Sequence, residues 1–106
     1  MHIMYNQGPA FIYEGLARAV FDNCTKYGDP FGIAAQDNYI RLFPNITEKG
    51  RRALSTIIIK MIIDHSDSEY KERLRKLDDN VWEAKTTEDI TAIIDKCIKI
   101  GNSLGY

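Results

Sequence analysis

The sequence has few of the residues that build metal centres and disulfide frameworks. Its 106 residues include two cysteines and two histidines. Cys24 and Cys97 are too few and too far apart for a set of disulfides or a zinc site. Both fall on apolar helical faces, as buried free thiols do. We therefore predict no metal ion, no cofactor and no enzyme, with a Cys97–His65 pair as the one nucleophilic alternative left open.

Long hydrophobic runs are also missing. No stretch of 18 consecutive apolar residues occurs, so we expect no membrane span. The opening letters MHIMYNQGP carry neither the basic start nor the apolar run of a secretory signal, which favours a cytoplasmic protein. The net charge of −1 gives no overall attraction to nucleic acid, so binding to a polyanion would need a local basic patch.

What the chain does have is the composition of one soluble domain, with 44% hydrophobic and 27% charged residues. We expect residues 1–106 to form a single helical domain in which residues 1–8 are loosely ordered. The predicted core of this domain is a central helix over residues 45–65. Asn45 and Glu48 fit a capping box at its start, and the apolar positions repeat at i, i+3, i+4 and i+7: Leu54, Ile57, Ile58 and Met61.

A strand over residues 55–63 is the alternative for this segment, because its threonine and isoleucines are β-branched. The length of the periodic run favours the helix. Ile59 and Ile63 fall outside the main apolar face, so the helix should be buried on more than one side. That excess of apolar surface predicts a homo-oligomer, with Ile59, Ile63 and the single tryptophan, Trp82, as interface residues.

The other segments complete a mainly α fold, a four-helix bundle-like domain with one short β-hairpin between its first and second helices. Residues 9–27 form the first helix, which Gly28 ends. We expect residues 31–43 to form the hairpin, turning at Gln36, Asp37 and Asn38. After the central helix come a third helix capped by Ser66 and a fourth capped by Thr86 or Thr87, which Gly101 ends. Short turns predict antiparallel neighbours.

A basic cluster at the start of the central helix departs from the usual charge pattern. Lys49, Arg51 and Arg52 lie where the helix dipole disfavours cations, with Gly50 among them. Helix N-termini have free backbone N–H groups that bind anions, and a glycine lets a phosphate approach the backbone. These four residues are our candidate phosphate or anion site. A solvated basic turn paired with nearby acids is the alternative.

The letters NITEKGRRAL after a short hairpin resemble the end of the wing in winged-helix transcription regulators, over about ten residues. Such a domain also needs a helix-turn-helix before its wing, and one clear helix precedes the cluster here. The resemblance implies DNA binding.

Two functions follow. The first is a small non-enzymatic binding or regulatory protein, an adaptor or inhibitor, that acts as a homo-oligomer and binds a protein partner. The alternative is binding of a nucleic acid or a nucleotide through the basic cluster.

Overall fold

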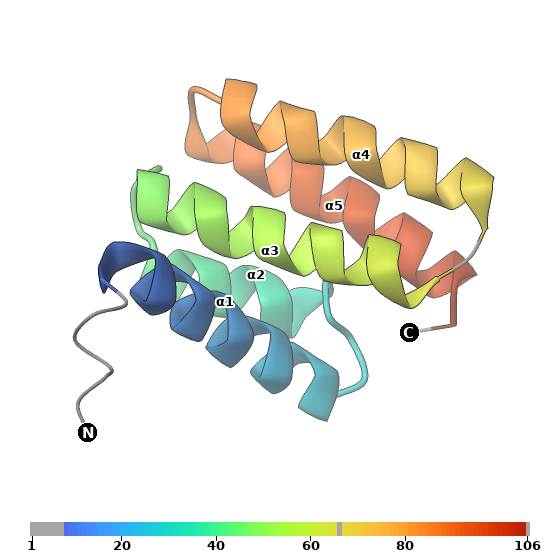
Figure 1. Cartoon of the computed structure of the whole chain (residues 1–106), viewed down its shortest axis with the longest axis horizontal. Coiled ribbons are helices and arrows are strands. Elements are labelled where there is room, and N and C mark those ends of the chain that lie inside the picture. Colours follow the sequence, from blue (N-terminus) through green and yellow to red (C-terminus); the bar gives the residue numbers. More distant parts are fainter. Residues whose placement is uncertain (1–7, 66, 106) are drawn as a thin grey trace.

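The computed structural model describes residues 8–65 and 67–105, with side chains from residue 15 onward, and these residues form helices and no strand (Figure 1). Consecutive helices run antiparallel, as the short turns predict. The mainly α fold is confirmed, but the predicted four-helix count is wrong, because the described residues form five helices. Our expectation for residues 1–8 lies outside the described residues, except that the first helix already begins at Gly8. The helices are α1 (Gly8–Lys26), α2 (Ile33–Leu42), α3 (Glu48–Asp64), α4 (Ser68–Glu83) and α5 (Thr87–Ser103).

The predicted β-hairpin over residues 31–43 is wrong, because α2 occupies this segment. The buried aromatic and small residues there recur in steps of four, which is the repeat of one helical face and not of a strand: Phe31, Ala35, Tyr39 and Phe43. Asn38, predicted in the turn, is buried in the helix, where its amide donates to the Ala34 carbonyl at 2.8 Å. The strand that the winged-helix resemblance requires before residue 45 is therefore not present in the described chain.

The core of the bundle lies around α3. In Figure 1, α1, α3 and α4 form the front layer, with α3 in the middle, while α2 and α5 lie behind them. α3 packs against α1 on one side and α4 on the other, and α5 closes the bundle against α4 and α2. The central helix is thus confirmed, and its buried face carries mostly apolar residues: Gly50, Ala53, Leu54, Ser55, Ile57, Ile58 and Met61.

Several helix ends differ from the expected positions. The N-cap of α3 is Thr47 and not Asn45, since the Thr47 hydroxyl accepts a hydrogen bond from the Gly50 amide at 2.9 Å. Asp67 caps α4, and Ser66 lies outside the described residues. Gly101 does not end α5, because this helix continues to Ser103 with Gly101 buried inside it. Glycine is common just after the end of a helix, but because it has no side chain it also allows close packing inside a helix.

The turn between α4 and α5 is held by its own side chains. Thr86, one of the two predicted caps, forms a capping box with Asp89 at the start of α5. The Asp89 carboxylate accepts hydrogen bonds from the backbone amides of Lys85 and Thr86, and these bonds lower the pKa of its carboxyl group. The start of α5 is therefore fixed against the end of α4.

None of the helices in the described ranges is long and apolar enough to cross a membrane.

Candidate functional site

Arg51 explains the unusual position of the basic cluster. Its guanidinium group lies against the end of α4, where Nη1 donates to the Val81 carbonyl and Nη2 to the Ala84 carbonyl, both at 2.6 Å. The last carbonyls of a helix lack partners within the helix and carry partial negative charge. α4 has no basic residue in its own last turn. Arg51 thus acts as a C-terminal cap for α4, supplied from the neighbouring helix.

Gly50 lets α3 and α2 approach closely. A Cβ atom at this position would lie 3.0 Å from the Tyr39 hydroxyl and 3.1 Å from Cβ and Cγ of Phe43. The residue is buried, and its amide already donates to Thr47. The glycine is therefore used for packing against the end of α2.

Lys49 and Arg52 are the exposed members of the predicted anion site. Arg52 Nη2 lies 3.3 Å from Glu48 Oε1, one turn earlier in the same helix. Arg51 points instead to α4, so the structure does not show the three cations gathered around one common site. The anion site stays a prediction, and with Arg51 and Gly50 engaged elsewhere it depends on Lys49 and Arg52.

The three predicted interface residues are all exposed. Ile59 and Ile63 lie one turn apart on α3, and Trp82 lies near the end of α4. Ile59 lines a groove of about 520 Å³ between α1 and α3, whereas Trp82 does not contribute to it. We call this groove, with Ile63 one turn beyond Ile59, the α1–α3 groove. Its other lining residues are Gly15, Ala17, Arg18, Phe21, Asp22, Thr56, Ile57 and Lys60.

The α1–α3 groove is apolar inside and carries charges of both signs at its edges. Phe21 and Ile57 contribute apolar surface, and Arg18, Asp22 and Lys60 are exposed. Gly15 is exposed, and a Cβ atom there would meet nothing within 4 Å. The groove therefore has room for a side chain or a helix from outside.

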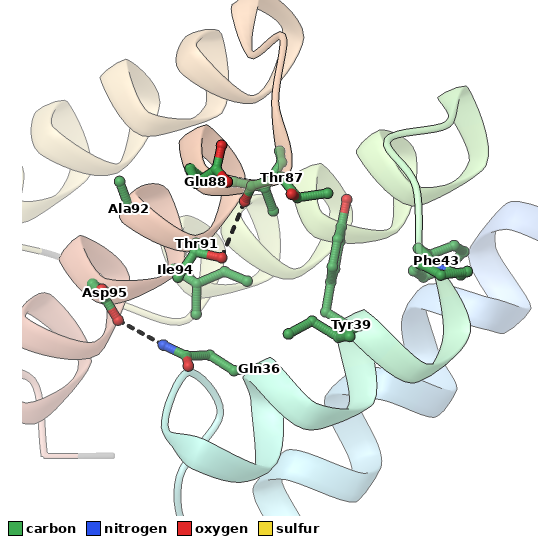
Figure 2. Close-up of a pocket in the computed structure, with 12 residues that line it drawn as sticks. Gln36, Tyr39, Phe43, Thr87, Glu88, Thr91, Ala92, Ile94 and Asp95 are labelled. Carbon is green, nitrogen blue, oxygen red and sulfur yellow. Dashed lines mark hydrogen bonds between the residues drawn. The ribbon is translucent and has the colours of Figure 1, made fainter.

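A second cavity, of about 440 Å³, lies between α2 and α5 (Figure 2). Tyr39, Ile90 and Ile94 provide buried apolar surface, and the Gln36 amide donates to the Asp95 carboxylate at 2.6 Å across its edge. Sequence reasoning missed this cavity because it placed residues 31–43 in a hairpin. The steps of four from Phe31 to Phe43 were the signal for a helix that faces α5.

The Tyr39 hydroxyl group is buried and has no hydrogen-bond partner among the described residues. Burial raises the pKa of Tyr39 to about 12, and the positive charge of Arg51 acts in the opposite direction. The phenol thus stays neutral over the physiological range. Its hydroxyl group extends from α2 toward Gly50 in the first turn of α3.

Both cysteines are buried free thiols, as predicted. Burial raises the pKa of Cys97 to about 12. Burial, with the negative charge of Asp29 as a smaller cause, raises the pKa of Cys24 to about 11, while a hydrogen bond with Asn38 lowers it. A protonated, buried thiol is a poor nucleophile, which argues against a role for Cys97 in covalent catalysis.

These thiols and Tyr39 should make the protein less stable at high pH. The ordinary pKa values of 9.0 for cysteine and 10.0 for tyrosine apply to the unfolded chain, so above pH 9 the unfolded state binds fewer protons than the folded state. Well below pH 9, these three groups should make no pH-dependent contribution to the free energy of unfolding. From pH 9 to pH 11 each buried cysteine should lower it by up to about 1.4 kcal/mol per pH unit, and Tyr39 should add a similar loss only above pH 10.

Urea denaturation at pH 8, 9, 10 and 11 measures this loss. The Cys97→Ala variant is the control, because it should start from a lower stability and lose less of it with rising pH. A free energy of unfolding that stays the same from pH 8 to pH 11 would contradict the burial of these groups.

No cluster of three or more histidine, cysteine, aspartate or glutamate side chains that could hold a metal ion occurs among the described residues.

No protein-family model matches the sequence, and no curated protein or solved structure is significantly similar to it. The function must therefore be argued from the surfaces of this chain alone.

Proposed function

We propose that the protein is a small non-enzymatic binding protein that acts as a homodimer, with the α1–α3 groove as the contact between the two copies. The observation that carries this proposal is the apolar surface along the groove, where Ile59 and Ile63 are 44% and 70% exposed. Removing isoleucine side chains from water is favourable by roughly 1.5–3 kcal/mol for each one fully buried. A partner that covers both therefore gains affinity.

The charges at the edges of the groove favour a second copy as the occupant. Arg18 and Asp22 lie one turn apart on α1, with opposite signs. In a two-fold contact each copy presents the same surface, so antiparallel α1 helices would place Arg18 opposite the partner's Asp22, and Asp22 opposite the partner's Arg18. A groove with one sign of charge would repel its own copy instead. The mixed signs are thus compatible with self-association.

Gly15 supports a helix as the element that enters the groove. Small residues allow two helix backbones to come close together, and the space above Gly15 is open. Gly15 lies inside α1, where glycine costs about 1 kcal/mol relative to alanine. A close helix contact in the dimer would give this costly residue a role.

Sedimentation velocity over a range of protein concentrations tests the proposal. We expect the wild-type protein to dimerise and Ile59→Lys/Ile63→Lys to remain monomeric at the same concentrations. The matched control is Ile33→Lys/Ile40→Lys on α2, since these isoleucines are 79% and 56% exposed and lie outside the groove. This control should dimerise as the wild type does.

Gly15→Gln separates loss of the contact from loss of the fold. The longer side chain should fill the open space and weaken dimerisation at least tenfold, because a blocked helix contact costs more than about 1.4 kcal/mol. The monomer should gain thermal stability, since glutamine is the better helix former. A wild-type protein that stays monomeric, or equal effects of the groove and α2 variants, would overturn the proposal.

Phosphate binding at Lys49 and Arg52 remains the alternative prediction from the sequence. Arg51 is hydrogen-bonded to α4, so this site would depend on two exposed side chains and on the first amides of α3. No contact in the described chain favours it over the homodimer.

A further inference from the structure

A second group of cations, away from the start of α3, lies between α4 and α5. Arg73 and Lys76 on α4 and Lys96 and Lys99 on α5 line one groove of about 210 Å³. Leu77 and Ile100 form part of its lining and are buried. We call this the α4–α5 groove. No aspartate or glutamate is among the residues that line it.

The two helices bring these cations to the same level. Each helix contributes two positions three residues apart, which lie on one face. α4 and α5 run antiparallel from a short turn. Lys76 and Lys96, near the middle of each helix, therefore come level, and Arg73 and Lys99 come level farther from the turn. The four positive side chains therefore line the same short groove.

The cations of the α4–α5 groove form no ion pair within the described chain. Some cations of the described chain have carboxylate partners within 4.0 Å, as Lys60 has in Asp64 and Arg75 in Glu72. None of the four groove cations has such a partner among the described residues, although the Arg73 guanidinium lies over the Tyr70 ring at 5.4 Å. Like charges close together repel one another, and a bound anion removes this repulsion.

We propose that the α4–α5 groove binds a small ligand through two adjacent phosphate groups. Four cations can balance the three to four negative charges of a diphosphate, and lysine binds phosphate as a point charge. The Asn80 amide lines the same groove and can donate a further hydrogen bond. The apolar surface of Leu77 and Ile100 lowers the local dielectric constant and strengthens these interactions.

The size of the groove limits what it encloses. Pockets that hold a whole drug-sized molecule measure about 300–1,000 Å³. At about 210 Å³, this groove accommodates the phosphate groups, while the rest of the ligand lies outside it. The proposal is independent of the homodimer, since the α4–α5 groove shares no residue with the α1–α3 groove.

Isothermal titration calorimetry with inorganic pyrophosphate tests the proposal, with ATP and a short DNA duplex as separate arms. We expect saturable binding of pyrophosphate that weakens with added salt. Lys76→Gln/Lys99→Gln should weaken it about tenfold, as should the separate pair Arg73→Gln/Lys96→Gln. All four side chains are exposed, so the variants should fold, which circular dichroism verifies.

The matched control is Lys26→Gln/Lys85→Gln, which removes the same amount of charge from two exposed positions outside the groove. It should leave pyrophosphate binding within twofold of the wild type. Binding of ATP in the same groove-dependent way would identify a nucleotide as a source of the diphosphate. The proposal is overturned by three results: no saturable binding of pyrophosphate, an equal loss in the control, or groove-dependent binding of the duplex alone.

Discussion

Arg51→Met should lower the free energy of unfolding by about 3 kcal/mol, because it removes two hydrogen bonds from a charged donor at roughly 1.5–3 kcal/mol each. Methionine keeps most of the aliphatic length, so the packing loss is small. The Val81 and Ala84 carbonyls at the end of α4 would lose their shared donor. Urea denaturation at pH 7 measures the change.

Two variants separate the cap from a general effect of charge. Arg51→Lys keeps the charge, but an ammonium group lacks the planar fork that reaches both carbonyls, so it should recover less than half of the stability. Arg52→Met, at the neighbouring exposed position with its i, i+4 pair to Glu48, should cost less than about 1 kcal/mol. Equal losses for Arg51→Met and Arg52→Met would show that the contacts of Arg51 with α4 do not matter.

Gly50→Ala should destabilise the protein by about 1–3 kcal/mol, although alanine is the better helix former. The added methyl group would lie 3.0 Å from the Tyr39 hydroxyl and 3.1 Å from two carbon atoms of Phe43. Both side chains are buried, so neither can move away freely. Thermal denaturation should show a lower midpoint for the variant than for the wild type.

A double-mutant cycle with Tyr39→Phe locates the cause. Tyr39→Phe alone should be neutral or slightly stabilising, because the buried hydroxyl has no hydrogen-bond partner in the described chain. In its background Gly50→Ala should cost less, since one of the close contacts is gone. Strictly additive effects would contradict the close approach of α2 and α3.

The sequence patterns predicted the helices with long apolar repeats. The face of α3, with Leu54 and Ile58, is as expected, and so is the capping of α5 by Thr86. The error over residues 31–43 came from giving Asp37 and Asn38 the weight of turn residues. Burial of Tyr39 and Ala35 against the bundle overrides that local preference.

The role of Arg51 could not be predicted from its own helix. Its charge is unfavourable in the first turn of α3, and the compensating carbonyls lie thirty residues or more farther along the chain, on α4. The α4–α5 groove is similar, since Lys76 and Lys99 form ordinary exposed patterns on their separate helices. Only the pairing of the two helices brings their charges together.

The sequence also predicted interface residues on α3. Ile59 and Ile63 were expected to be covered by a partner, and within one chain they are exposed. That exposure is what the homodimer proposal explains.

The most direct test of the homodimer is to record amide ¹H–¹⁵N NMR spectra of the wild-type protein from dilute to concentrated solution. The account predicts concentration-dependent shifts that cluster at residues 15–22 of α1 and 56–63 of α3, with the exposed face of α4 unchanged. Spectra that do not change with concentration, or shifts that cluster on α2 or α4 instead, would contradict it.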